Sequence, residues 1–501
     1  MAQDEVSGGA LTDVGSLYSP LVGMIFVFNL IVGTGALAMP GAFQSAGWLL
    51  SLILVGCIGF TSYVTVSYIL ESMACANAML QYGRRIKPAQ ESEDSPLVTP
   101  NSSNESINDT DQLLSGPIAD DYFMIRERVE LGQMVSLFFN KVGVVLFYIC
   151  LIVYLYGDLA IYAAAVPKSL RDIICLYKPP YPNCSMGWND TLLTDATQCF
   201  PGVTSISRMT AYRLCVVLFA LCLGPFTFFN VQKTTALQLL TTFLRWFSFG
   251  SMIVLALVEL SRGPKVVAKT ADFAHVPDLF GVCVYSFMCH HSLPSLVTPI
   301  RNKSRLGVLL AGDYILVFSF YALLSLTAVF AFANIPELYT LTFEPRHCPD
   351  PNNPAPSFFQ YFLALFPVFT LSTNFPIISI TLRNNMKTLF LKPDKTYHFL
   401  IDRIAFPFLV LLPPIAVAVA TSRVDFLVGI TGSYAGSAVQ YFIPVALVYC
   451  ARKTIRQTFG LHVHHKSVSP FKHIAWLIGL TLWATACIIF VTIKFIIPSP
   501  S

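Results

Sequence analysis

Two hydrophobic segments of this chain are interrupted at matching places by residues that could bind a small polar ligand. The first, residues 20–43, is interrupted by Gly-Thr-Gly at 33–35. The second, residues 276–300, is interrupted by Cys-His-His at 289–291, and a proline follows each interruption. Glycine and proline unwind a helix and free backbone N–H and C=O groups, which lipid cannot satisfy. Paired interruptions in two halves of a chain are typical of secondary transporters, in which the freed groups meet the substrate.

The first interruption offers groups for both ends of an amino acid. The exposed N-terminus of a half-helix carries partial positive charge and suits a carboxylate, whereas outward-turned carbonyls suit an ammonium group or Na⁺. Asn29, one turn before the interruption, can offer a side-chain oxygen to a cation. The alternative is that the glycines only let two helices pack closely. The candidate substrate-binding residues here are Val32, Gly33, Thr34 and Gly35.

Asp158 and Arg245 lie inside apolar segments, where a charge is costly and therefore a candidate for function. Arginine stays charged, so Arg245 cannot carry a proton. It could occupy the space of a sodium ion, or its head could snorkel to the membrane surface. Asp158 could carry a proton if burial favours its neutral form, or it could neutralise Arg245 or fill a polar gap.

Histidines add a further source of pH dependence. His290 and His291 lie in the second interruption, and a buried histidine titrates near neutral pH. His291 could equally be polar filling. A second group, His462, His464 and His465, lies in a polar loop where no cysteine or carboxylate completes a metal site. A solvated basic surface explains that group better, and the sequence predicts no metal or other cofactor.

Long apolar runs must position these residues. Hydrophobic residues make up 54% of the 501 and charged residues 12%, against roughly 25% charged in soluble domains. Runs of about 20 apolar residues, long enough to cross a bilayer, recur eleven times. The sequence therefore predicts an all-α polytopic membrane protein, and the net charge of +4 gives no reason to expect a nucleic acid partner. The predicted spans are 20–42, 47–72, 141–166, 209–230, 234–259, 277–300, 307–332, 357–382, 400–420, 426–450 and 473–497.

The distribution of Lys and Arg predicts the orientation in the bilayer. These residues concentrate in alternate loops, which the positive-inside rule places in the cytoplasm together with the N-terminus. An odd number of spans then puts the C-terminus on the outer or lumenal side. In the predicted organisation, a cytoplasmic N-terminus at 1–19 is followed by helices one and two at 20–80 and by a disordered cytoplasmic insert at 81–125. Residues 126–260 contain helices three to five, with a lumenal loop at 170–207. Helices six to ten follow at 261–450, then a cytoplasmic loop at 451–472, and finally helix eleven with a lumenal C-terminus at 473–501.

The predicted lumenal loops carry sites for covalent modification. Glycosylation is expected at Asn183 and Asn189, whereas three further sequons lie in the predicted cytoplasmic insert and should stay unused. Four lumenal cysteines are candidates for two disulfides, for which three pairings exist, and free thiols are the alternative. The pairing Cys184–Cys199 closes a short loop and is favoured. The four cysteines are Cys175, Cys184, Cys199 and Cys348.

The insert contains a short pattern with a bearing on localisation. Asp109, followed four residues later by Leu113-Leu114, resembles an acidic dileucine signal that sorting adaptors read for delivery to endosomes and lysosomes. Ordinary disordered sequence produces such patterns as well. The sequence therefore predicts a multi-pass protein of endolysosomal membranes or of the plasma membrane.

Motifs across the chain resemble a family of permeases. Residues 29–40 read Asn-x-x-Val-Gly-Thr-Gly-x-Leu-x-x-Pro and resemble the first helix of the amino acid/auxin permease family. Residues 287–294 are similar to the sixth-helix break of that family, and residues 428–444 to its tenth helix. Over nearly the whole chain, including 158–162 and 282–287, the sequence resembles the transmembrane protein 104 family.

The resemblance implies a fold and a binding site. The fold is of the LeuT type, in which five helices repeat in inverted orientation with helices one and six broken, here followed by an eleventh helix. Members of the permease family carry small neutral amino acids together with Na⁺ or H⁺. The sixth-helix motif adds Phe287, Cys289 and His290 to the substrate-binding residues.

In sodium-coupled relatives, an Asn of the first helix and a hydroxyl of the eighth helix bind the ion. Asn29 matches the former, and Ser372 and Thr373 offer hydroxyls for the latter. Their spacing to Pro376 departs from that of the relatives by one residue, which puts the sodium site in doubt.

The sequence thus predicts an ion-coupled secondary transporter of small neutral amino acids. Asn29 and the two hydroxyls argue for Na⁺. Arg245, Asp158 and His290 argue for H⁺, which we favour. The alternative is a non-transporting amino acid sensor that has the same pocket. The sequence contains no zincin motif, no phosphate loop and no nucleophile in a recognisable setting, so no enzymatic activity is predicted.

Overall fold

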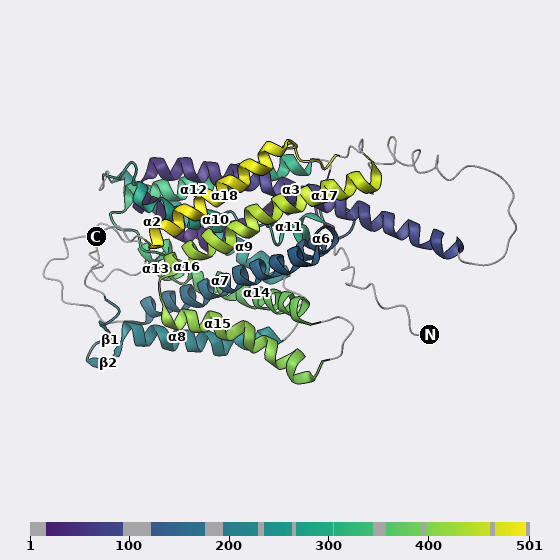
Figure 1. Ribbon diagram of the computed structural model, residues 1–501. Helices are drawn as coiled ribbons and strands as arrows, with labels where there is room; N and C mark the ends of the chain where they lie inside the picture. Colours follow the sequence, from purple (N-terminus) through teal and green to yellow (C-terminus); the bar gives the residue numbers. More distant parts are fainter. Residues whose placement is uncertain are drawn as a thin grey trace, which may run out of the picture.

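A bundle of long helices makes up most of the chain (Figure 1). The computed structural model describes residues 17–93, 122–175, 194–228, 235–262, 267–303, 305–343, 357–391, 397–460 and 466–496. Within these residues, nine helices are long and apolar enough to cross a membrane, and a bent pair of helices provides a tenth span. The chain is therefore a polytopic helical membrane protein, as predicted.

The first apolar segment forms two helices, α1 (Pro20–Ile31) and α2 (Thr34–Ala46). The Ser19 side chain accepts the N–H of Val22 and caps α1, and Pro20 suits the first helical turn. The two helices are bent by 55° at the break between them. After α2, Gly47 adopts a φ of +90°, and a Cβ there would lie 2.6 Å from the backbone nitrogen of Ala271. Only glycine fits this turn.

The third helix, α3 (Trp48–Glu93), is longer than the sequence predicts and projects beyond the bundle (Figure 1). The expected insert begins at residue 81, but the helix continues for thirteen residues past residue 80. The segment that follows the insert docks on this extension. The Asn77 side chain accepts the N–H groups of Arg126 and Glu127, and Arg84 forms two bonds of 2.5 and 2.7 Å with Glu127.

A short helix that the sequence analysis did not predict, α6 (Leu131–Phe138), precedes α7 (Lys141–Ile174). A reciprocal capping box between Glu130 and Gln133 starts α6. The side chain of Asn140 caps α7. The helix α7 ends eight residues later than the predicted span.

A hairpin of two antiparallel strands, β1 (Gln198–Phe200) and β2 (Val203–Ser207), leads into α8 (Arg208–Leu223) at one end of the bundle. We call this end the hairpin side (Figure 1). A disulfide joins Cys175, at the end of α7, to Cys199 of β1. Closing this loop of 24 residues contributes roughly 3 to 4 kcal/mol by restricting the unfolded chain.

The predicted pairing of Cys184 with Cys199 is therefore wrong. Sequence separation favoured Cys184, but the hairpin brings Cys199 to the end of α7, where its Cα lies 4.4 Å from that of Cys175. A buried pair of 2.7 Å between Arg171 and Asp172 and a second pair from Asp172 to Arg208 fix this junction. Cys184, Cys348 and the sequons at Asn183 and Asn189 lie outside the described residues, as do Asp109, Leu113 and Leu114.

The second interrupted segment forms two short helices, α10 (Val276–Ser286) and α11 (Leu293–Val297), separated by residues 287–292. Its break thus matches the prediction in position. The predicted eighth span is also divided, at Leu365. The other elements of this part are the 3₁₀ turn η2 (Gly224–Phe228), α9 (Thr235–Ser261), the 3₁₀ turn η3 (Phe273–His275), α12 (Leu306–Ala331), the 3₁₀ turn η4 (Tyr339–Phe343), α13 (Ser357–Ala364) and α14 (Phe366–Phe390).

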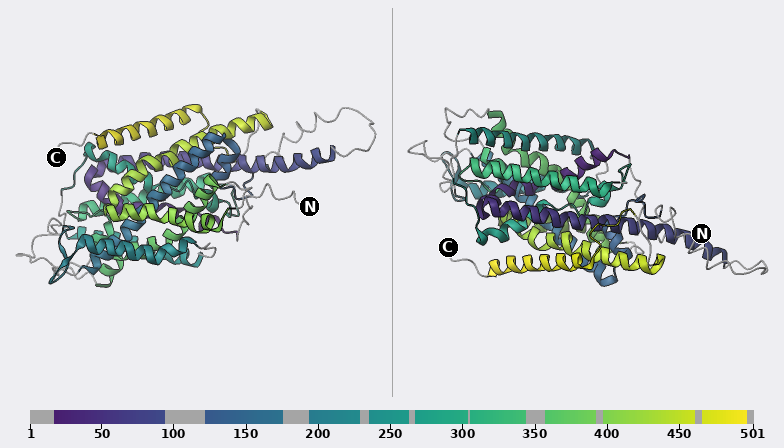
Figure 2. Two further views of the ribbon diagram at one scale, coloured as in Figure 1. Left: turned by 60° about the horizontal axis from the view of Figure 1, so that its bottom comes forward. Right: turned by 90° about the horizontal axis from the view of Figure 1, so that it is seen from above.

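The predicted tenth span contains two π-helical turns, which occur mostly at functional sites. Glycines let this span approach α10 closely, since a Cβ on Gly432 would lie 1.9 Å from the carbonyl oxygen of Gly281. The last helix runs along the edge of the bundle in both views of Figure 2. These elements are the π turn η5 (Leu400–Ala405), α15 (Phe406–Ala420), α16 (Val424–Thr431), the π turns η6 (Gly432–Gly436) and η7 (Ala438–Phe442), α17 (Ile443–Phe459) and α18 (Ile474–Ile496).

Candidate functional site

The two breaks lie against each other in the middle of the bundle, because α2 packs on α10. A Cβ on Gly35 would lie 2.2 Å from the hydroxyl of Ser286 and 2.7 Å from its Cα. A Cβ on Gly33 would meet nothing within 4 Å. The packing interpretation therefore applies to Gly35, whereas Gly33 faces open space.

Arg245 of α9 caps the first break. Its guanidinium donates to the carbonyl of Asn29 at 2.5 Å and to that of Val32 at 3.3 Å. Neither carbonyl continues the helical ladder, because the N–H of Gly33 bonds to the carbonyl of Ile31 and the N–H of Ala36 to that of Gly33. Arg245 is only 8% exposed, so its head lies in the break and does not snorkel to the membrane surface.

The side chain of Asn29 also pairs with α9. Its amide nitrogen donates to the hydroxyl of Thr242 at 2.9 Å. Within the described part of the chain, no hydrogen bond joins Asn29 to Ser372 or Thr373, the predicted sodium-binding hydroxyls of α14. The hydroxyl of Thr373 donates to the carbonyl of Thr370, one turn back along its own helix, at 2.9 Å.

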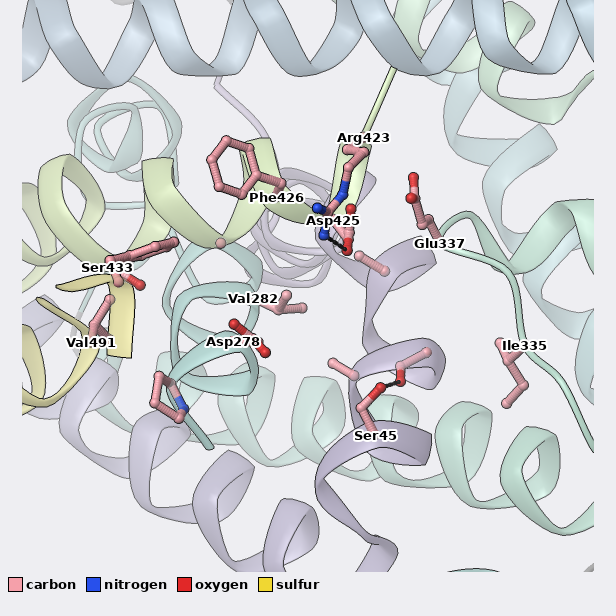
Figure 3. A pocket seen from close by; sticks show the side chains of 16 residues that line it. Ser45, Asp278, Val282, Ile335, Glu337, Arg423, Asp425, Phe426, Ser433 and Val491 are labelled. Atoms are coloured by element: carbon pink, nitrogen blue, oxygen red, sulfur yellow. Dashed lines mark hydrogen bonds and ion pairs between the residues drawn. The ribbon is translucent and has the colours of Figure 1, made fainter. Parts of the chain in front are cut away.

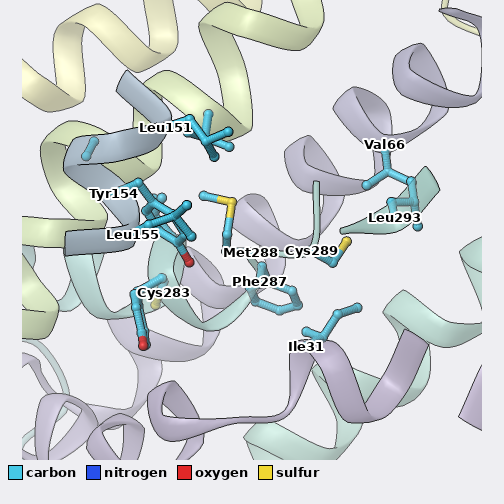
Figure 4. Close-up of a cluster of buried hydrophobic side chains, with 14 of the residues drawn as sticks. Ile31, Val66, Leu151, Tyr154, Leu155, Cys283, Phe287, Met288, Cys289 and Leu293 are labelled. Atoms are coloured by element: carbon cyan, nitrogen blue, oxygen red, sulfur yellow. The ribbon is translucent and has the colours of Figure 1, made fainter. Parts of the chain in front are cut away.

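Tyr321 of α12 connects the two breaks. Its hydroxyl lies 3.1 Å from the carbonyl oxygen of Ile31 and 2.9 Å from that of Ser286. The Phe287 ring packs edge-on against Tyr321, with ring centres 5.4 Å apart, and stacks on Tyr314 at 5.9 Å. Figure 4 shows Phe287 and Ile31 facing each other across the breaks. A single buried hydroxyl therefore holds the ends of α1 and α10 at a fixed spacing.

Neutral groups from α3 and α12 close the second break. Ser62 donates to the carbonyl of Phe287 at 3.3 Å and shares a hydrogen bond of 2.9 Å with the hydroxyl of Tyr314. The hydroxyl of Tyr314 also lies 3.3 Å from the sulfur of Cys289. The Nε2 atom of His290 is 2.8 Å from the hydroxyl of Thr65, and the imidazole is fully buried.

The carboxylate of Asp158, predicted as a proton carrier or a structural group, lies among hydroxyls. Tyr285 donates a hydrogen bond to it, and Tyr162 lies beside it. Tyr162 also lies beside Thr34 of the first break and Asn374 of α14. Asp158 forms no salt bridge with Arg245 within the described residues. Tyrosine hydroxyls, and not the guanidinium, therefore satisfy this buried carboxylate.

A cavity of about 190 Å³ lies on the hairpin side of the breaks, between α2, α10, α16 and α18 (Figure 3). Four charged residues line it, each with a partner of opposite charge, namely Asp278, Glu337, Arg423 and Asp425. Asp278 pairs with Lys494 of α18, and Arg423 lies 3.5 Å from Asp425. Figure 3 shows Glu337 near Arg423 and Asp425, with Asp278 across the cavity. The sequence analysis did not identify these residues, because each lies at a helix end or in a loop.

Glu337 covers one wall of this cavity. Its carboxylate accepts from Lys168 at 2.5 Å and from the N–H of Val424 at 3.1 Å. Burial, reinforced by the nearby Asp425, raises the pKa of Glu337 above its ordinary value, although Lys168 and the Val424 N–H oppose this. The carboxyl therefore takes up a proton at a higher pH than a glutamate in water.

The sequence analysis also missed Asp313 of α12. The signal was present, because the rule that selected Asp158 applies to any carboxylate inside an apolar span. The residue is 1% exposed, and neither of its carboxylate oxygens has a hydrogen-bond partner in the described part of the chain.

Comparison with known proteins places the chain in a family. A family model described as transmembrane amino acid transporter protein matches residues 18–88, which contain the first break. Transmembrane protein 104 of Homo sapiens is 49% identical over 501 residues, covering 98% of this chain and 99% of the relative. The homolog of Drosophila melanogaster is 45% identical, covering 95% and 97%, and that of Dictyostelium discoideum is 34% identical, covering 96% and 98%. These alignments span nearly the full length of both partners, and the chain therefore belongs to the transmembrane protein 104 family.

Proposed function

We propose that the chain is a secondary transporter of small neutral amino acids with a LeuT-type arrangement of two inverted five-helix repeats. The observation that carries this proposal is the contact between the two breaks. Backbone carbonyls from both halves of the chain converge on one buried point, with open space at Gly33 beside it. The match of residues 18–88 to an amino acid transporter model supports the same function.

The coupling ion that the geometry favours is H⁺. Arg245 already fills the carbonyl cage of the first break, where a sodium ion would otherwise bind. A fixed guanidinium about 4 Å from Na⁺ costs roughly 4 kcal/mol at an effective dielectric near 20, which is enough to empty a weak site. The amide nitrogen of Asn29, one of the predicted sodium ligands, donates to the hydroxyl of Thr242.

A sensor without transport remains the second candidate, and one observation favours it. Arg245 and Tyr321 satisfy the freed carbonyls of the first break without any ligand. A ligand that displaced these side chains from the carbonyls could change the conformation of the bundle and so be sensed, with no passage of the ligand.

Uptake into proteoliposomes separates the two candidates. The full chain is reconstituted, and a panel of small neutral amino acids is tested with Na⁺ and pH varied independently. Saturable uptake that depends on a proton gradient supports the transporter, and ligand binding without flux supports the sensor. Strict Na⁺ dependence that is lost in Asn29→Ala and kept in Arg245→Gln would reverse the choice of ion.

Gly33→Val tests the position of the pocket. A branched side chain fills the open space beside the break, so binding should be abolished while surface expression changes little. Gly250→Val is the matched control, because a Cβ on Gly250 also meets nothing within 4 Å but lies on an exposed face of α9. Normal transport by the Gly33 variant would exclude the first break as the site.

The proposed orientation puts the N-terminus in the cytoplasm and the hairpin side outside or in a lumen, in an endolysosomal or plasma membrane. Asn183 and Asn189 should then be glycosylated. A glycosidase mobility shift should disappear in the double variant Asn183→Gln plus Asn189→Gln, and a shift that persists would overturn this orientation.

A further inference from the structure

Asp313 has no structural explanation in the bundle. It lies in α12, seven residues after the helix begins at Leu306, and is 1% exposed. Both of its carboxylate oxygens are shielded from solvent and have no hydrogen-bond partner in the described residues. An ionised carboxylate in such a place costs several kcal/mol, whereas the neutral acid costs far less. The conformation shown by the structure therefore suits the protonated side chain.

Within the described residues, no cation pairs with the carboxylate of Asp313. The neighbours of α12 are α1, α2, α3 and α9. Neither α1 nor α2 contains a charged residue. In α9, Arg245 is bound to the carbonyls of the first break, and Glu259 lies 3.5 Å from Arg262.

The charged residues of α3 with described side chains are also occupied. Glu71 forms two bonds with Arg452, and Arg84 pairs with Glu127. At the start of α12, Arg301 and Arg305 are exposed, and Lys303 donates to the carbonyl of Ile300 at 2.8 Å. The thiol of Cys289 lies close enough to be affected by a charge on Asp313, and it shares a hydrogen bond with Tyr314.

The position of Asp313 gives it a route to water. A Cβ on Gly312, the preceding residue, would lie 3.9 Å from the side chain of Met24 in α1. A backbone pairing of Tyr18 with Pro299 and Arg301 ties the beginning of α1 to the end of α11. The halves of the two broken segments that lie on the N-terminal side of the bundle, α1 and α11, are therefore linked to each other. Movement of this linked pair away from α12 would admit water to the carboxyl.

We propose that Asp313 is a proton-binding site, which is protonated in the closed bundle and releases its proton to water when α1 and α11 move away from α12. This proposal rests on the proposed function and names the residue that couples it to H⁺. Asp158, the carboxylate that sequence reasoning favoured, is a poorer carrier, because Tyr285 donates to it and Tyr162 lies beside it. Those hydroxyls stabilise the ionised form of Asp158, and Asp313 has nothing comparable.

Infrared difference spectroscopy detects the proton without any transport. The purified full chain in lipid nanodiscs is compared between mildly acidic and alkaline buffer. The wild type should show a band of a protonated carboxyl without a hydrogen-bond partner, at a higher frequency than that of a hydrogen-bonded carboxyl such as Glu337, and this band should vanish at alkaline pH. The band should be missing in Asp313→Asn and present in Asp158→Asn, the matched control at an equally buried carboxylate. A band that persists in Asp313→Asn, or that is absent from the wild type, would overturn the proposal.

Uptake gives the second measurement. Wild-type uptake should change with pH by up to about tenfold per unit, the limit for one bound proton, and uptake by Asp313→Asn should be independent of pH. Asn is isosteric with the neutral acid and should fold as the wild type does, which a thermal melting curve checks. Wild-type pH dependence that is retained in Asp313→Asn would contradict the role of this residue. If no variant transports any amino acid, the proposed function fails, and the infrared band alone decides whether Asp313 binds a proton.

Discussion

The first break is capped by a charge, and the second is closed by neutral groups. At the first break, the guanidinium of Arg245 reaches two backbone carbonyls and leaves open space at Gly33. At the second, Ser62 and Tyr314 bond to the backbone and the thiol, and the ring of Phe287 fills the gap between helices. The two breaks match in sequence position but not in physical chemistry.

In the proposed transporter, this difference gives each break a separate role. A charged cap can be displaced only by another cation or by movement of α9, so a cationic ligand group would compete at the first break. The second break has little free volume, since a Cβ on Gly59 of α3 would already lie 3.1 Å from the Phe287 ring. It supplies a wall and the carbonyl of Ser286. The hydroxyl of Tyr321 bonds to this carbonyl and also to the carbonyl of Ile31 at the first break.

Arg245→Leu should have the largest effect on this asymmetry. The change leaves the carbonyls of Asn29 and Val32 buried without donors, and each orphaned carbonyl costs about 1 to 3 kcal/mol. The melting temperature of the purified chain should therefore fall markedly. It should recover with Na⁺, which can now enter the carbonyl cage, but less with a bulky organic cation.

The wild type is the control for this ion effect, and its melting temperature should not respond to Na⁺ at constant ionic strength. Sodium stabilisation of equal size in the wild type and in Arg245→Leu would contradict the view that the guanidinium fills a cation cage.

Gly35→Ala should have the next largest effect. The new methyl would lie 2.7 Å from the Cα of Ser286, which only backbone movement of α2 or α10 can relieve, and overpacking of this kind costs about 1 to 3 kcal/mol. Thermal melting should show the loss directly. Gly33→Ala is the control two residues away, and its stability should match the wild type because the added methyl meets open space.

The sequence was sufficient to predict the two breaks, since Gly33 and the residues around His290 unwind their helices wherever the chain places them. The sequence also indicated that Arg245 and Asp158 are candidates for function, because each places a charge inside an apolar segment. The sequence could not predict that Gly35 packs against a neighbouring helix whereas Gly33 faces open space, because this depends on how closely α2 approaches Ser286. The disulfide was mispredicted for a similar reason, since β-hairpin pairing, and not loop length, brings Cys199 to Cys175.

Contacts between distant segments account for the remaining differences. Tyr321 has the sequence pattern of an ordinary core tyrosine, and only the folded chain shows its hydroxyl between Ile31 and Ser286. Within the extension of α3, Arg84 pairs with Glu127, which lies 43 residues later in the chain. Composition alone predicts that disorder begins at residue 81, because composition contains no information about contacts with distant segments of the chain.

Tyr321→Phe should weaken the link between the two breaks by a smaller amount. Removing one buried hydroxyl that serves two carbonyls costs about 1 to 3 kcal/mol, and the ring stays to pack against Phe287. Hydrogen exchange should increase in residues next to both breaks. Tyr339→Phe is the control, because the hydroxyl of Tyr339 is buried without a partner in the described residues and its loss should be neutral or stabilising.

Ser62→Ala should have the smallest effect, since the second break has redundant neutral caps. The hydroxyl of Ser62 makes a long bond of 3.3 Å to the Phe287 carbonyl and a shorter one to Tyr314, and a typical neutral hydrogen bond contributes about 1 kcal/mol. Tyr314 keeps its contact with Cys289, so melting should change little and the choice of coupling ion not at all. A loss as large as that of Arg245→Leu would mean that the second break is as polar as the first, and the division of roles between the two would have to be abandoned.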